Sequence, residues 1–124
     1  MKAIICGALL VLTITIANAA EDINSANFML PYCKMTTKEA AADTTNAIGH
    51  AHCYGTIYGV SQMLILLQHS QHPDPIVCTT VPPSATPEQL VNVVIKYAAV
   101  HPEMTHHPFV ALAFVAMREA WPCK

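Results

Sequence analysis

The sequence has few charged residues, and this scarcity narrows the functions open to the protein. Only 11% of its 124 residues are Asp, Glu, Lys or Arg, and their formal net charge is −2. A protein that binds nucleic acid needs clustered cations to neutralise phosphates, so we expect no nucleic-acid partner. A mildly acidic chain also attracts a basic partner only weakly once salt screens its charge.

Three signatures of chemistry are missing as well. No C-x-x-C motif occurs, so the cysteines indicate neither a redox pair nor a zinc site. No serine, histidine and aspartate order typical of a catalytic triad is recognisable. Two histidine pairs, His50 with His52 and His106 with His107, would point to different faces of a helix and make a poor ligand set. His69 and His72 lie at a predicted helix end, where a histidine also suits the helix dipole. We therefore expect no enzyme activity, no metal and no cofactor.

What the sequence has instead is an excess of apolar residues, 53%, part of which lies in an N-terminal leader. Lys2 gives a minimal positive start, residues 3–16 are mostly apolar, and Ala17-Asn18-Ala19 matches the A-x-A cleavage pattern. A membrane anchor is the alternative, but the apolar run is shorter than the ~20 residues of a spanning helix. We predict a signal peptide over residues 1–19 and one periplasmic domain over residues 20–124, with no membrane attachment after cleavage.

Export changes the interpretation of the cysteines. Four remain after the leader is removed, Cys33, Cys53, Cys78 and Cys123, and an even number in a small exported chain implies two disulfides. Three pairings are possible. If the chain doubles back near Asp43, Cys33 and Cys53 lie level with each other on two adjacent segments. We therefore favour Cys33–Cys53 with Cys78–Cys123.

The longest apolar run of the mature chain, residues 46–69, predicts a long buried helix. Small and apolar residues recur in it at three- and four-residue spacing, among them Ile48, Gly55, Gly59 and Leu66. Each glycine costs ~1 kcal/mol against alanine inside a helix. We therefore predict that another backbone packs closely against Gly55 and Gly59. The alternative is a core helix with two permissive glycines.

Capping patterns mark the elements before this helix. Ser25 or Asn27 is predicted to cap a first helix, in which Pro31 should lie near the first turn. Thr36 and Glu39 form a T-x-x-E capping box for a short helical turn. Residues 44–46 are then predicted to cap the long helix.

Two more helices follow. Thr86, Pro87 and Gln89 give the clearest helix start in the chain, and that helix should end at 101–102. Thr105 is predicted to cap the last helix, with Pro108 inside its first turn. Together these segments predict an all-α fold, a compact four-helix bundle with one short extra helix and two disulfides.

The loop between the long helix and the next one is predicted to be stiff. Residues 70–85 contain four prolines and no glycine, so neither a helix nor a central strand can form there. A stiff loop pinned at Cys78 loses little entropy when it docks on a partner. We predict that it binds a partner protein through Gln71, His72, Asp74, Pro75 and Ile76; the alternative is that it only wraps the bundle.

Several segments, taken in order, resemble one protein family. They are Tyr32-Cys33, HCYGTIYGV at residues 52–60, Cys78, TPEQLVNVVIKY at 86–97, HPEMTHHP at 101–108 and Trp121-Pro122-Cys123. Over nearly the whole mature chain they resemble the Rap/Tai group of bacterial immunity proteins.

The resemblance implies a periplasmic immunity protein that inhibits a peptidoglycan amidase delivered by type VI secretion. Such proteins are small, helical, disulfide-containing homodimers that occlude the catalytic cysteine and histidine of the amidase. The resemblance assigns Cys33, Cys53, Cys78 and Cys123 to bridges and makes Gly55 and Gly59 packing positions. A second class of function also fits the sequence, a general periplasmic binding or chaperone-like helical protein whose histidines respond to pH.

Overall fold

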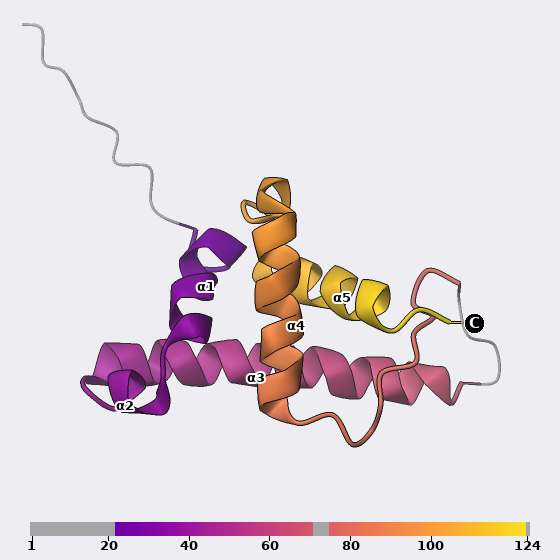
Figure 1. Cartoon of the computed structure of the whole chain (residues 1–124), viewed down its shortest axis with the longest axis horizontal. Coiled ribbons are helices and arrows are strands. Elements are labelled where there is room, and N and C mark those ends of the chain that lie inside the picture. The colour runs from indigo at the N-terminus through magenta and orange to yellow at the C-terminus, as the bar shows by residue number, and fades with distance from the viewer. Residues whose placement is uncertain (1–21, 71–74, 124) are drawn as a thin grey trace, which may run out of the picture.

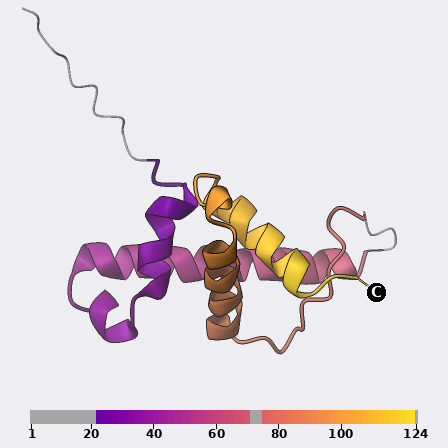
Figure 2. The same ribbon diagram turned by 45° about the horizontal axis from the view of Figure 1, so that its top comes forward.

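The computed structural model describes residues 22–70 and 75–123, and every regular element in this part of the chain is a helix. It contains α1 (Ala26–Lys34), α2 (Thr37–Ala40), α3 (Thr44–Gln68), α4 (Pro87–Val100), the 3-10 helix η1 (Pro102–Met104) and α5 (Phe109–Ala120). Figure 1 shows α3 along the length of the molecule, crossed by α1 and α4, with α2 beside one end. Figure 2 shows the same crossings from another side. The predicted fold, four main helices and one short helix with two disulfides, is confirmed.

The core lies where α1, α4 and α5 pack on α3 and on one another. All four helices contribute large, fully buried side chains to it: Met29, Ile57, Leu64, Leu90, Val94, Leu112 and Met117. Burial of one such side chain is worth ~1.5–3 kcal/mol.

Two predicted helix starts have the expected capping boxes. Thr36 Oγ1 accepts the backbone N–H of Glu39 at 3.2 Å, and the Glu39 carboxylate accepts the N–H of Thr36 at 2.7 Å. Thr86 and Gln89 make the same reciprocal pair at 3.3 and 2.9 Å. Each pair satisfies two N–H groups that have no partner within the helix.

Near the N-terminus, α1 has one of its two predicted caps but not the predicted place of its proline, and α3 starts one residue earlier than predicted. Ser25 caps α1 by accepting the N–H of Phe28 at 3.3 Å, so Pro31 lies in the second turn and not in the first. Pro31 is exposed, and water can therefore reach the carbonyl that loses its helical partner. Asp43 caps α3 by accepting the N–H of Asn46 at 2.9 Å, one residue before the predicted cap.

The start of α5 also differs from its prediction. Thr105 is the C-cap of η1 and does not cap α5, which begins at Phe109 with Pro108 at its N-cap position. The N–H of Phe109 donates to the carbonyl of Asn24 at 2.7 Å, and the N–H of Ala26 donates to the carbonyl of His107 at 2.9 Å. The first turns of α1 and α5 therefore satisfy each other's free N–H groups through backbone that is distant in sequence.

Candidate interaction surface

Two disulfides cross-link segments of the described chain. Cys33–Cys53 joins α1 to the middle of α3, with Cα atoms 5.5 Å apart, and both residues are buried. Cys78–Cys123 joins the segment after α3 to the C-terminus, with Cα atoms 5.7 Å apart. Cys123 is exposed. This is the pairing that the sequence favours.

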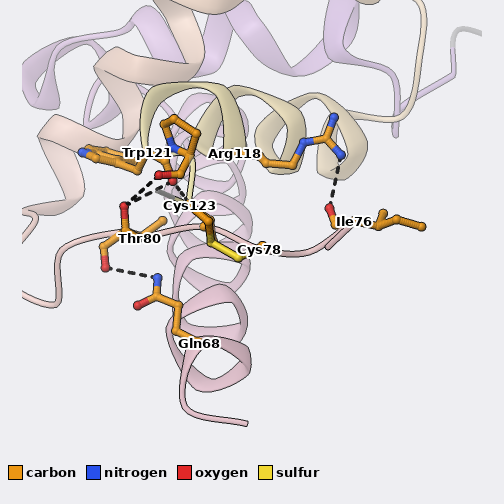
Figure 3. Close-up of a disulfide and its surroundings, with 10 residues drawn as sticks. Gln68, Ile76, Cys78, Thr80, Arg118, Trp121 and Cys123 are labelled. Carbon is orange, nitrogen blue, oxygen red and sulfur yellow. Dashed lines mark hydrogen bonds between the residues drawn. A yellow bond between two sulfur atoms is a disulfide. The ribbon is translucent and has the colours of Figure 1, made fainter. Parts of the chain in front are cut away.

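Residues 75–81, which we call the strap, are held against α5 and the chain end by hydrogen bonds (Figure 3). Thr79 Oγ1 and the N–H of Thr80 both donate to the carbonyl of Trp121 at 2.8 Å. The Arg118 guanidinium donates to the carbonyl of Ile76 at 3.2 Å, and its cation lies 5.8 Å from the centroid of the Phe114 ring. The strap is thus anchored along most of its length.

The predicted partner-binding residues lie at the start of the strap or just before it. Gln71, His72 and Asp74 fall outside the described residues. Pro75 and Ile76 are exposed, and the Ile76 side chain is 65% accessible. An apolar side chain presented on a fixed backbone is a suitable anchor for a protein partner.

The exposed face of α3 is the face that the sequence predicted to be buried. The α3 residues in the core are Cys53, Ile57, Ser61 and Leu64. The opposite face is exposed and contains Ile48, Ala51, His52, Gly55, Tyr58, Gly59, Gln62, Met63 and Leu66. α3 has no Asp, Glu, Lys or Arg, so no charged side chain marks which of its two apolar faces meets solvent.

The prediction that Gly55 and Gly59 pack against another backbone is wrong within the described chain. A Cβ atom added at either position would meet nothing within 4 Å. The closely packed glycine is Gly49, where an added Cβ would collide with the Tyr32 ring of α1. The sequence analysis overlooked Gly49, although it lies four residues from Cys53 and hence near the crossing with α1.

Grooves border this exposed face on both sides. The α3/α5 groove, about 620 Å³ in volume, has walls that include Val60, Met63 and Phe114. A second groove, about 650 Å³, lies between α3 and residues 81–87 and is lined partly by Tyr54 and Tyr58. Gly55 borders both grooves. The exposed face of α3 therefore lies between the two grooves, and its smallest residues are the glycines.

Two titratable groups with altered pKa values, Tyr97 and Glu103, lie near the end of α4. His101 Nδ1 lies 3.2 Å from Glu103, and its Nε2 lies 3.8 Å from Glu119. The Glu103 backbone N–H, followed by the hydrogen bond with His101, lowers the pKa of the Glu103 carboxyl. Burial, followed by the neighbouring carboxylates, raises the pKa of Tyr97, whose ring stacks on His101. Both shifts favour the protonation state that each group already has at neutral pH, an ionised Glu103 and a protonated Tyr97.

Of the histidines in the three pairs, His72 lies outside the described residues, and His52, His69, His106 and His107 are exposed. His50 bonds the Tyr32 carbonyl at 3.0 Å, whereas His69 ends α3 and bonds the Ile65 carbonyl. Among the described residues, no three His, Cys, Asp or Glu side chains are arranged to hold a metal ion. In the same residues, no helix has the length and apolar character needed to cross a membrane.

Comparisons with known proteins give one match. A family model described as Rap1a immunity proteins matches residues 25–123. No curated protein and no solved structure matches the chain significantly. The matched range spans every helix described above, both disulfides and the strap.

Proposed function

The chain belongs to the Rap1a family of immunity proteins, and from this we propose that it neutralises a type VI secretion effector that cuts peptidoglycan peptides. The effector is an amidase with a catalytic cysteine and histidine. The protein binds it in the periplasm and inhibits it by covering the active-site cleft. The family match over residues 25–123 is the observation that carries this proposal.

The protein acts by steric occlusion and catalyses no reaction itself. Its four described cysteines are all paired in disulfides, so none is available as a nucleophile. A binding role needs a rigid scaffold with exposed apolar anchors, because a partner then loses little free energy in ordering the interface. The bridged helices and the anchored strap support this role.

The same disulfides support export of the protein to the periplasm, because disulfides persist there and are rare in the cytosol. We propose that residues 1–19 are a signal peptide and that residues 20–124 form the mature, single-domain protein. The mature protein has no membrane attachment and acts as a homodimer.

Contact with the effector is assigned to the strap and the residues before it. Ile76 presents an exposed side chain while Arg118 holds its carbonyl. Gln71, His72, Asp74 and Pro75 complete the predicted contact set. An apolar anchor placed over a catalytic cleft excludes the substrate peptide without needing any chemistry.

Co-purification and growth protection test the proposal. The mature protein, exported to the periplasm, should form a stable complex with an exported cysteine-histidine amidase and prevent lysis. We expect Ile76→Ser to weaken the complex at least about tenfold, the effect of an interface anchor, with unchanged melting. Val100→Ser is the matched control, because Val100 is 73% exposed on α4, away from the strap. Absence of any complex and of any protection would refute the proposal, whereas an intact complex with Ile76→Ser would refute only the assignment of the strap.

A further inference from the structure

The α3/α5 groove is an apolar cavity that the proposed contact with the effector does not use. Its volume is about 620 Å³, and its walls expose only apolar surface. Ligand sites in proteins typically measure ~300–1,000 Å³ and are mostly apolar. Met63 and Val110 line the groove from its two helices and are 62% and 53% exposed. An apolar ligand in the groove would therefore leave water and contact both helices.

The shape of the groove suits one unbranched alkyl chain. The groove follows the line along which α5 packs on α3. Its α3 wall extends from Gly55 to Leu67, which is about 18 Å along the helix axis. Between these ends lies Gly59, where an added Cβ atom would meet nothing within 4 Å. The space beside Gly59 is therefore free for the atoms of a ligand.

The only arginine of the sequence lies at one end of this groove. Arg118 is one turn beyond Phe114 on α5, and its guanidinium carbon is 5.8 Å from the centroid of the Phe114 ring. The guanidinium also donates to the carbonyl of Ile76 at 3.2 Å (Figure 3), the residue before Val77. Because Phe114 and Val77 both line the groove, the guanidinium lies at its rim, beside the strap.

The charge of Arg118 has no carboxylate partner in the described part of the chain. The ion pairs found there join His101 to Glu103 and to Glu119, so the acidic neighbour of Arg118 is directed to a histidine. A guanidinium has several N–H donors, and one of those of Arg118 donates to Ile76. The others can hold a carboxylate, whose two oxygens match the fork of the guanidinium.

We propose that the α3/α5 groove binds a long-chain fatty acid, with the alkyl tail between the two helices and the carboxylate on Arg118. One cation at the end of an apolar slot is complementary to a ligand with one anionic head and one tail. α3 has no Asp, Glu, Lys or Arg, so the long wall of the groove offers no second charge. This binding does not depend on the proposed inhibition of an amidase.

Titration calorimetry with fatty acids of increasing length tests the site of the tail. The mature, oxidised protein is titrated with decanoate, dodecanoate and tetradecanoate, each below its critical micelle concentration. Each added CH₂ group should lower the dissociation constant about fourfold, the effect of burying one methylene. An affinity that does not rise with chain length would overturn the proposal.

A side chain that fills the groove should block the tail. Gly59 lines this groove and not the second one, and Gly59→Leu should raise the dissociation constant of dodecanoate at least about tenfold. The variant should melt no lower than the unchanged protein, because the new side chain enters open space. Ser84→Leu is the matched control, since it places the same side chain at an exposed site in the second groove and should leave binding unchanged.

Comparison of dodecanoate with dodecanol, which has the same tail and no charge, tests the site of the head. The unchanged protein should bind dodecanoate at least about tenfold more tightly, the effect of a hydrogen bond to a charged group. Arg118→Gln should remove this preference, and Arg118→Lys should keep part of it. Lys96→Gln, which removes the same charge from α4, should leave the preference unchanged.

Three further results would overturn the proposal. They are binding that occurs only above the micelle concentration, binding that Gly59→Leu leaves intact, and a preference for the carboxylate that persists in Arg118→Gln. If no fatty acid binds and Gly59→Leu instead breaks the complex with the amidase, the groove belongs to the effector. Loss of dodecanoate binding with full amidase inhibition in Gly59→Leu would support the fatty-acid site and separate it from inhibition.

Discussion

Replacing Gly49 by alanine should destabilise the protein. The same replacement at a helix position with open space around it normally stabilises a protein. Gly49 lies where α3 passes under α1, and an alanine Cβ would lie against the Tyr32 ring, 2.5 Å from Cε1 and 2.6 Å from Cγ. These separations are far shorter than a van der Waals contact. Either the ring or the helix must therefore move.

The surroundings make both movements costly. Cys33, next to Tyr32, is bridged to Cys53, one turn from Gly49, so α1 cannot easily retreat from α3. Ring rotation loses the packing of Tyr32 with Phe28, whose ring centroid is 5.6 Å away. Overpacking of a filled site costs ~1–3 kcal/mol, and we take the upper half of that range because the bridge limits relaxation. The higher helix propensity of alanine than of glycine offsets ~1 kcal/mol of this cost. The net destabilisation is therefore ~1–2 kcal/mol.

Gly55→Ala is the matched control, since it makes the same chemical change in the same helix, at a site with open space. It should stabilise the monomer by up to ~1 kcal/mol. Both variants are compared by urea unfolding of the mature, oxidised protein at a concentration where it is monomeric. In a Tyr32→Ala background, Gly49→Ala should become stabilising, because the opposing ring is gone. If Gly49→Ala stabilises the unchanged chain as much as Gly55→Ala does, the close packing of α1 on Gly49 is wrong.

Two further predictions concern acid and reduction. Hydrogen bonds from the Thr36 backbone and hydroxyl lower the pKa of Glu39 below its usual 4.5, so its stabilising effect is present above pH 4.5 and is lost as pH falls through the lowered value. Glu39→Gln is the control, because glutamine does not titrate in this pH range. Relative to this variant, the unchanged chain should lose stability only at acid pH, and urea unfolding at neutral and acid pH measures the difference. A dithiol should reduce Cys78–Cys123 before Cys33–Cys53. Cys123 is exposed, whereas Cys33 and Cys53 are both buried. Timed alkylation and mass spectrometry give the order, and simultaneous reduction would contradict the difference in access.

Local signals in the sequence were sufficient to predict most of the helices. The capping boxes at Thr36 and Thr86 are short-range patterns, and both occur where predicted. The start of α5 could not be found this way, because the carbonyl that accepts its first N–H belongs to Asn24, far away in the chain. Thr105 offered a local alternative, which the fold does not use.

The candidate surface was harder to predict than the fold. α3 is apolar on both faces, so residue spacing could not distinguish the face that meets α1, α4 and α5 from the face that is exposed. Likewise, a glycine packs closely only if another element lies against it. The sequence does not show that the Tyr32 ring of α1 lies against Gly49, or that the space beside Gly55 is open. Both errors concern which elements pack against each face of α3, and this is a property of the tertiary structure.

The exchange of backbone bonds between residues 24–26 and 107–109 sets a limit on how the chain can fold. The N–H groups of Ala26 and Asn27 in the first turn of α1 lack their partners until the segment before α5 is in place, so no stable N-terminal intermediate is expected while the chain is being made. Such long-range closure slows folding. It also means that a chain still attached to the ribosome cannot complete the first turn of α1 until residues 105–107 have emerged.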